Sequence, residues 1–181
     1  MYIYSTSERK ISLKKEIWEW TKAIIIAVIL AFFLRTYVFA TSIVEGTSMD
    51  PTLHNGERVI FNKAIYLLDE PERGDIVIIQ HPNKNYVKRV IGLPNETIQV
   101  IDNVLYINGK PTEQPYLPEQ QKLETGDFGP VEIPTGEYFV MGDNRDISKD
   151  SRNGLGFIEE DDIIGRSEII IYPFDNISLT R

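Results

Sequence analysis

The sequence predicts a mainly β protein, in which an antiparallel, barrel-like sheet domain follows a single N-terminal transmembrane helix. One long uncharged apolar run, Ala23–Leu34 (AIIIAVILAFFL), lies near the N-terminus. After about residue 43, short segments rich in Val and Ile alternate with Gly, Pro and Asn, which is typical of strands joined by turns. No long amphipathic helical pattern separates these segments, so the strand–helix–strand units of a parallel sheet are not expected.

The apolar run is long enough to cross a bilayer. Counted on to Ala40 it covers about 18 residues, and such a helix is about 27 Å long, close to a hydrocarbon core of about 30 Å. Lysines and arginines precede it at Arg9, Lys10, Lys14, Lys15 and Lys22. The positive-inside rule then places residues 1–22 in the cytoplasm, residues 23–40 in the cell membrane as a single-pass anchor, and residues 41–181 on the outer face.

Two alternatives to an anchor remain open from the sequence. The run could be a buried helix of a soluble core, although its flanking charges favour a membrane span. Val38-Phe39-Ala40 also resembles the small-x-small site after which a signal peptide is removed. The long charged segment before the run and the bulky Arg35-Thr36-Tyr37 favour an anchor that is retained.

The predicted strands are short, rich in branched or aromatic residues, and bounded by turn residues. They are Arg58–Ile65, Asp75–Gln80, Tyr86–Gly92, Thr97–Ile101, Val104–Ile107, Glu137–Met141 and Glu168–Tyr172. Asp102-Asn103 is the expected two-residue turn of a hairpin. Residues 109–134 are rich in Pro, Gln and Gly, and we expect an extended loop or small insertion there.

The composition excludes several classes of function. The 181-residue chain is 42% hydrophobic, enough for one domain with a core. Its formal net charge of −8 argues against a nucleic-acid partner, which would require a basic surface. The absence of cysteine excludes thiolate zinc sites and a cysteine nucleophile. His54 and His81 lack the close spacing of a helical metal pair.

A candidate nucleophile lies in the stretch GTSMDPTL, residues 46–53, just after the apolar run. The Ser48 hydroxyl is a weak nucleophile unless a base activates it. The stretch also has a structural interpretation, in which Asp50 caps a short helix that begins at Pro51.

A candidate base lies in the predicted strand Tyr86–Gly92. Alternation places Lys88 between Tyr86 and Val90 on one face, with Arg89 on the other. Apolar neighbours disfavour an ammonium ion and lower the pKa of a lysine. A lysine that acts as a base near neutral pH needs a pKa about two units below its usual value of about 10.4, which costs about 2.7 kcal/mol. The alternative is an exposed lysine whose stem covers apolar surface.

The third stretch, Gly142–Arg152, is dense in acids, bases and hydroxyl groups. It could be a solvated charged loop. Asp143, Asp146 and Asp150 could bind a cation, but interspersed basic residues oppose this, and the calcium-loop pattern is missing. It could also be a scaffold of ion pairs that fixes the Ser148 hydroxyl beside the lysine, since an amine base needs an orienting partner.

These three stretches, in this order behind an apolar anchor, resemble bacterial type I signal peptidases of the compact Gram-positive form. Those proteins are membrane-bound serine proteases with a Ser–Lys dyad. The matching segments are Gly46–Leu53, Lys88–Pro94 and Gly142–Arg152, so the resemblance spans nearly the whole chain. It implies that Ser48 is the nucleophile and Lys88 the general base of an endopeptidase that works through an acyl-enzyme, without metal or organic cofactor.

The resemblance also implies supporting roles. Ser148 would orient the Lys88 amine, Met49 would pack beside the nucleophile, and Arg89 would pair with one of the acids. The other structural supports are Asp143, Arg145, Asp150 and Arg152.

Some family members carry a serine two residues before the nucleophile, and its hydroxyl helps to bind the oxyanion. Here that residue is Gly46. We therefore expect the backbone N–H of Ser48 and one further donor to bind the oxyanion, with Gly46 allowing a close backbone approach.

The implied partners are the lipid bilayer and secretory preproteins with small residues one and three positions before the cut. Shallow apolar pockets would accept those residues, with Val44, Ile78 and Val87 as candidate lining. An extended substrate could pair with an exposed strand edge.

Three rival functions remain open. The first is a soluble, self-cleaving Ser–Lys protease with a DNA-binding domain, which the apolar run and the acidic charge disfavour. The second is a Ser-His-Asp hydrolase that uses His54 or His81. The third is a membrane-tethered binding protein with a degenerate site.

Overall fold

The structure is a computed structural model that describes residues 6–82 and 84–180, with side chains from Leu13 onward. Residues 1–5, which begin the predicted cytoplasmic segment, and the side chains of Arg9 and Lys10 lie outside this description, as does Arg181. The chain divides into two compact units, Met1–Val38 and Phe39–Arg181.

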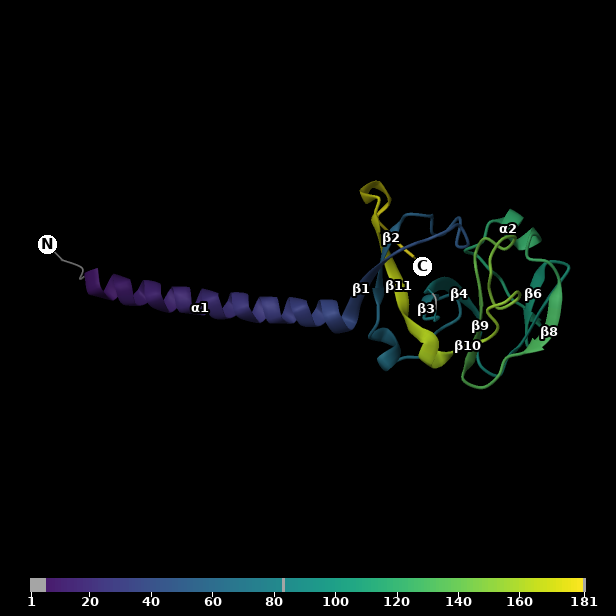
Figure 1. The fold of residues 1–181 in the computed structure, drawn as a ribbon, viewed down its shortest axis with the longest axis horizontal. Helices are drawn as coiled ribbons and strands as arrows, with labels where there is room; N and C mark the ends of the chain where they lie inside the picture. Colours follow the sequence, from purple (N-terminus) through teal and green to yellow (C-terminus); the bar gives the residue numbers. More distant parts are fainter. Residues whose placement is uncertain (1–5, 83, 181) are drawn as a thin grey trace. The chain divides into compact units, whose positions relative to one another are not determined.

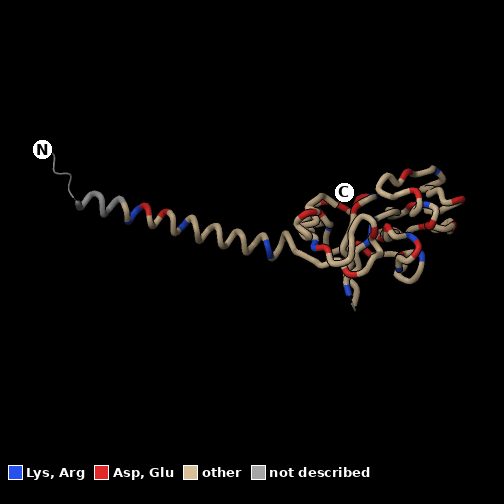
Figure 2. Tube along the Cα trace, turned by 90° about the horizontal axis from the view of Figure 1, so that it is seen from above, with Lys and Arg blue, Asp and Glu red and all other residues tan. Residues whose placement is uncertain are grey.

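The described residues of the first unit form one long helix. α1 (Thr6–Phe33) continues into a π-helical segment, η1 (Leu34–Val38). Residues Leu13–Val38 are long and apolar enough to cross a membrane, and none of the side chains in that span is buried within the protein. Figure 2 shows the uncharged middle of this helix as an uninterrupted tan stretch. An apolar surface of this extent is expected to face lipid or a partner, and it does not fit the helix of a soluble core.

The helix ends two residues before the predicted boundary at Ala40. Phe39 and Ala40 instead begin β1 (Phe39–Ile43), where they lie opposite Asn62 and Phe61 of β2 (Arg58–Asn62). The aromatic and small side chains of this segment suit either state, and the pairing with β2 decides between them.

The second unit contains two sheets (Figure 1). The larger has the strand order β1-β2-β11-β3-β4-β9-β10, with β12 paired to β11, and the smaller has the order β7-β6-β5-β8. The further strands of the larger sheet are β2 (Arg58–Asn62), β3 (Ile76–Ile79), β4 (Tyr86–Gly92), β9 (Glu137–Met141), β10 (Ile158–Glu159), β11 (Ile163–Tyr172) and β12 (Ser178–Leu179). Those of the smaller sheet are β5 (Thr97–Ile101), β6 (Val104–Ile107), β7 (Lys110–Pro111) and β8 (Phe128–Glu132).

The pairing within both sheets is antiparallel, which confirms the predicted fold class. Register shifts interrupt the pairing of β11 with both β2 and β3. Such bulges bend a strand and increase its twist, so the larger sheet curls into a half barrel. The hairpin of β5 and β6 is also confirmed, because Asp102 and Asn103 both have the positive φ of a two-residue turn, 51° and 63°.

The prediction of an extended loop or small insertion at residues 109–134 did not name the elements that form there. This segment contains β7, a short helix α2 (Glu119–Leu123) and β8. The β8 sequence FGPVE carries glycine and proline, which disfavour a strand, but β8 pairs with β5 in the smaller sheet. Gly129 is required there, since a Cβ atom at this position would lie 2.7 Å from the Ile98 carbonyl oxygen. Three short 3-10 helices, η2 (Ile65–Leu67), η3 (Glu160–Asp162) and η4 (Phe174–Asn176), complete the fold.

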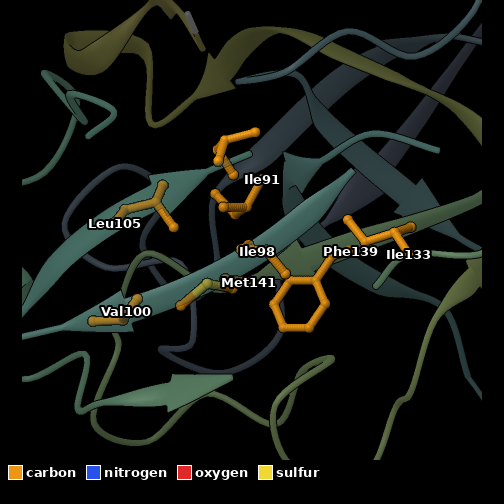
Figure 3. Packing of buried hydrophobic residues seen from close by; sticks show 8 residues of the cluster. Ile91, Ile98, Val100, Leu105, Ile133, Phe139 and Met141 are labelled. Atoms are coloured by element: carbon orange, nitrogen blue, oxygen red, sulfur yellow. The ribbon is translucent and has the colours of Figure 1, made fainter. Parts of the chain in front are cut away.

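Buried apolar side chains join the two sheets and support the loops above them. Ile91, Phe139 and Met141 of the larger sheet pack with residues of the smaller one, including Ile98 and Leu105 (Figure 3). A separate cluster lies under the segment that carries Ser48. Its buried members are Val44, Met49, Leu53, Val59, Ile76 and Ile170.

Candidate active site

Ser48 lies in a hydrogen-bonded turn between β1 and β2. The Thr52 and Leu53 N–H groups donate to the Met49 carbonyl oxygen at 2.9 and 3.0 Å. Met49 and Leu53 are buried in the apolar cluster beneath, at 1% and 0% exposure. The apolar residues of this segment therefore hold the turn in place, and Ser48 remains partly exposed above it.

The structural interpretation of Asp50 as a helix cap is wrong. Residues 50–53 form a turn, and the Asp50 carboxylate lies 2.7 Å from His54 Nδ1 instead of binding helical N–H groups. His54 also makes no hydrogen bond with Ser48 in the described part of the chain. A Ser-His-Asp arrangement at Ser48 is therefore not supported. His81 stacks edge-on against Tyr86 at 5.5 Å.

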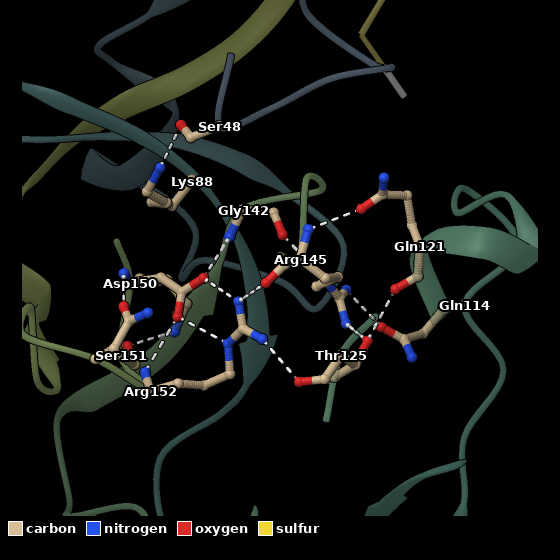
Figure 4. Close-up of polar contacts among 12 residues, drawn as sticks. Ser48, Lys88, Gln114, Gln121, Thr125, Gly142, Arg145, Asp150, Ser151 and Arg152 are labelled. Atoms are coloured by element: carbon tan, nitrogen blue, oxygen red, sulfur yellow. Dashed lines mark hydrogen bonds and ion pairs between the residues drawn. The ribbon is translucent and has the colours of Figure 1, made fainter. Parts of the chain in front are cut away.

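Lys88, from β4, reaches Ser48 across 40 residues of sequence. Its Nζ atom donates a hydrogen bond to Ser48 Oγ at 2.6 Å, and only 2% of the residue is exposed (Figure 4). Burial lowers the pKa of Lys88 from 10.5 to about 8, although the Asp150 and Asp143 carboxylates oppose this shift. Lys88 therefore has the contact and the pKa that a base for Ser48 requires.

Arg89 extends from the opposite face of β4 and pairs with Asp143. Its Nε and Nη2 atoms donate to the two carboxylate oxygens of Asp143 at 2.9 and 2.6 Å, and both side chains are buried. The Thr52 hydroxyl donates to the same carboxylate at 2.5 Å. The ring of Tyr116 lies 4.0 Å from the guanidinium carbon of Arg89. One carboxylate thus connects the Ser48 turn, β4 and the loop after β9.

Asp150 and two arginines fix the rest of that loop. Asp150 accepts a hydrogen bond from the Gly142 N–H at 3.1 Å and from Arg152 Nε and Nη2 at 3.0 and 2.9 Å (Figure 4). Arg145 is 2% exposed and donates to the Gly142 carbonyl oxygen at 3.0 Å and to Gln114 Oε1 at 2.6 Å. Arg152 donates to the Arg145 carbonyl oxygen at 2.8 Å.

The ion pairs also decide against the cation-binding interpretation of this loop. Arginines neutralise Asp143 and Asp150, and Asp146 is exposed. Among the side chains that the structure describes, in residues 13–82 and 84–180, there is no group of three or more His, Cys, Asp or Glu residues that could hold a metal ion.

Ser148 is fully buried beside the Ser48 turn, but its expected hydrogen bond to Lys88 is not formed here. Its hydroxyl finds no partner among the residues that the structure describes. Gly142 brings the two segments together, since a Cβ atom at that position would overlap both Ser148 Oγ and the Ser48 carbonyl oxygen. The orienting role of Ser148 stays a prediction.

Asn144 holds the Ser48 turn through two hydrogen bonds, and the sequence analysis did not single it out. Its N–H donates to the Ser48 carbonyl oxygen at 3.1 Å, and its side-chain amide donates to the Thr47 carbonyl oxygen at 3.1 Å. Asparagine is common in loops, so the only signal was its place beside Asp143 in the third stretch.

The donors near Ser48 have distinct uses. Gly46 adopts a positive φ of 85°, and its N–H donates to Asn55 Oδ1 at 2.9 Å, so this group is occupied. No hydrogen bond from the Ser48 N–H is found within the described part of the chain, so this group is a candidate donor to an oxyanion.

A groove of about 470 Å³ lies against Ser48 and Lys88. Three segments line it, namely residues 42–49, residues 84–88, and the pair Ile147 and Lys149. Of the three candidate pocket residues, Val44 and Val87 line this groove, whereas Ile78 is buried in the sheet and is not among the residues that line it.

Comparison with known proteins identifies the family. Residues 17–172 match the family described as signal peptidase, peptidase S26. The chain belongs to the signal peptidase family. A signal peptidase I from Bacillus licheniformis is 52% identical over 184 residues, covering 97% of this chain and 99% of that protein. Signal peptidase I T from Bacillus subtilis is 52% identical over 172 residues, covering 90% and 89% of the two chains.

A crystal structure of a signal peptidase I from Enterococcus faecalis matches with a TM-score of 0.49 at 35% sequence identity, covering 54% of this chain and 97% of that chain. The sequence relationships confirm the resemblance seen in the three motifs. The chain is an enzyme of the signal peptidase class, and a Ser–Lys dyad is a general feature of that class.

Proposed function

We propose that this protein removes signal peptides from secreted preproteins through a Ser48–Lys88 dyad and an acyl-enzyme intermediate. The observation that carries the proposal is the 2.6 Å contact between Lys88 Nζ and Ser48 Oγ in a buried setting. The neutral form of Lys88 can accept the Ser48 proton, and burial makes that form accessible near neutral pH.

In the first step, Ser48 Oγ attacks the scissile carbonyl carbon while neutral Lys88 takes the hydroxyl proton. The Ser48 N–H is the candidate donor to the resulting oxyanion, and one such donor is typically worth about 2.7–4 kcal/mol. The Lys88 ammonium then protonates the leaving amine, and the C–N bond breaks to give the acyl-enzyme. The Asp150 and Asp143 carboxylates favour the charged form of Lys88, so they stabilise the ammonium ion that exists between proton uptake from Ser48 and proton transfer to the leaving amine.

In the second step, neutral Lys88 takes a proton from water, and the hydroxide attacks the acyl carbonyl. Collapse of the tetrahedral intermediate releases the new carboxyl terminus and returns the proton to Ser48 Oγ. The same amine therefore serves as base and acid in both halves, as imidazole does in a Ser-His pair.

The groove suits an extended peptide with small side chains. β1 stands at one end of the strand order, and its residues Ser42 and Ile43 line the groove. An extended substrate can hydrogen-bond to such a strand edge, while Val44 and Val87 offer apolar contacts to small residues before the cut.

We infer that α1 and η1 are a retained anchor, with the N-terminus in the cytoplasm and the sheet domain on the outer face of the cell membrane. Cleavage after Ala40 would cut β1, which pairs with β2 from Phe39 onward. Ser48 follows Val38, the last residue of η1, by ten residues. A fully extended chain of that length spans about 35 Å, which is therefore the upper limit of the distance between Val38 and Ser48. Tethering raises the effective concentration of a site relative to preproteins in the same membrane.

The test is cleavage of a purified secretory preprotein with a small-x-small site by the full chain in detergent. Wild type should cut after the second small residue, and Ser48→Ala and Lys88→Met should be inactive while circular dichroism shows folded protein. Methionine keeps most of the volume of lysine without its amine. The matched control is His54→Ala together with His81→Ala, which should retain activity.

Lys88→Met activity comparable with wild type would overturn the dyad, because another base would then act on Ser48. A wild-type protein that leaves the preprotein intact, where a Bacillus signal peptidase cuts it, would overturn the proposed activity itself.

A further inference from the structure

The groove beside Ser48 carries positive charge on an otherwise acidic protein. The formal net charge of the chain is −8. Besides the catalytic Lys88, two exposed lysines, Lys84 and Lys149, line the groove, whereas Glu45 is the one carboxylate among its described lining residues. The acidic balance of the whole chain therefore reverses at the place where the substrate would lie.

The side chain of Lys84 packs against the ring of Tyr86. Its Nζ atom lies 4.9 Å from the centroid of the Tyr86 ring, which also lines the groove. The charge of Lys84 is close enough to Lys88 to lower the pKa of the catalytic amine. The ammonium group thus lies within electrostatic reach of the reacting atoms.

Lys149 lies on a fixed backbone in another segment that lines the groove. Its sequence neighbours Ser148 and Asp150 are fully buried, and the Asp150 N–H donates to Asn153 Oδ1 at 2.8 Å. Its Cε atom would lie 3.1 Å from a Cβ atom at position 154, where the chain has glycine with φ of 108°. Gly154 therefore leaves room for the stem of Lys149.

Neither lysine forms an ion pair with a carboxylate among the residues that the structure describes. The arginines of the same region differ, because Arg89 and Arg152 are paired with Asp143 and Asp150. The two lysines are thus cations that the fold does not use in ion pairs of its own.

We propose that Lys84 and Lys149 select substrates that carry an acidic side chain within a few residues of the scissile bond. The inference rests on the proposed function, since it concerns the same groove. Exposed ion pairs are individually weak, so each lysine should favour a glutamate over a glutamine by about 1.5- to 5-fold in kcat/KM. A basic side chain at the same position should be disfavoured, because it would meet uncompensated positive charge.

The experiment uses a neutral parent peptide with a small-x-small site and derivatives with one Glu, Gln or Lys at each position within four residues of the cut, except the two small positions, which stay unchanged. Wild type, the double variant Lys84→Gln with Lys149→Gln, and the control Lys110→Gln are compared by kcat/KM at low salt. Lys110 is an exposed lysine of β7 in the smaller sheet and does not line the groove.

Wild type and Lys110→Gln should prefer Glu over Gln over Lys at one or more positions, and about 1 M salt should remove the preference because it screens exposed charges. The double variant should lose the preference and still cut the neutral parent. Binding of the Glu and Gln peptides to Ser48→Ala should follow the same order, since the attraction exists before the reaction.

An equal kcat/KM for Glu and Gln peptides in wild type would overturn the inference, as would an unchanged preference in the double variant. If wild type cuts the neutral parent without any charge preference, only this inference fails. If wild type does not cut the neutral parent, the proposed function fails with it.

Discussion

The pH dependence of cleavage is the sharpest test of Lys88 as the base. Burial disfavours the ammonium form, which lowers the pKa of Lys88 to about 8. At pH 7 a lysine with that pKa is about 9% neutral, whereas an unperturbed lysine is about 0.03% neutral, so burial increases the reactive form about 300-fold. The experiment therefore varies the pH, and kcat/KM should follow the neutral fraction of Lys88.

The assay is kcat/KM for a peptide substrate without ionisable side chains, measured in detergent from pH 6 to pH 10.5. Because kcat/KM reports the ionisations of the free enzyme, it should rise about tenfold per pH unit below pH 8 and become level above it. Direct titration of Lys88 in the inactive Ser48→Ala variant, by NMR of labelled lysine, should give a midpoint in the same range.

Two results would refute this reasoning. A rise that continues to pH 10 or above would show that burial does not lower the pKa of the amine proposed as the base. A midpoint between pH 6 and pH 7 that disappears in His54→Ala would assign the base to histidine. Lys110→Gln is the matched control, and its profile should coincide with that of wild type.

The remaining predictions concern stability and positioning. The folded-state pKa of Lys88 lies below its unfolded value, so its burial destabilises the fold most below pH 8, and this penalty is lost as pH rises to 10.5. Lys88→Met should therefore raise the free energy of unfolding at pH 7, by up to about 3 kcal/mol, and denaturant titrations should show the gain shrinking towards pH 10.5. Asp143→Ala leaves Arg89 buried and unpaired, so the same titrations should show a loss of about 3–5 kcal/mol, and a loss below 1 kcal/mol would contradict the anchoring role. Ser148→Ala removes a buried hydroxyl without a described partner, so the free energy of unfolding should stay equal or rise. If Ser148 orients Lys88 during the reaction, this variant should lower kcat and change KM less. An unchanged kcat would exclude that role.

Local patterns in the sequence were sufficient for the parts of this protein that depend on neighbouring residues. The uncharged run predicted the long apolar helix, and Asp102-Asn103 predicted the hairpin of β5 and β6. Strand alternation at Tyr86–Gly92 placed Lys88 and Arg89 on opposite faces, and the structure has them contacting Ser48 and Asp143 respectively. These features could be predicted because strand and turn geometry act over a few residues.

Local patterns failed where a partner strand decides the outcome. β8 forms within a stretch rich in Pro and Gly because β5 offers backbone hydrogen bonds. The sequence of β8 itself does not predict a strand. Phe39 and Ala40 join β1 for the same reason, since β2 lies beside them. Strand formation depends on long-range pairing, which short sequence windows do not contain.

The sequence by itself determined which residue types could carry the chemistry, namely a serine, a lysine and a charged loop in one order. Only the tertiary structure decided their partners: Asp143 with Arg89, Asp150 with Arg152, and Asn144 on the Ser48 turn. It also decided that the Gly46 N–H is occupied by Asn55 and that Lys84 and Lys149 face one groove. The physical reason is that these contacts form where the sheets bring separate loops together, and the order of strands in a sheet is set by the packing of the whole domain.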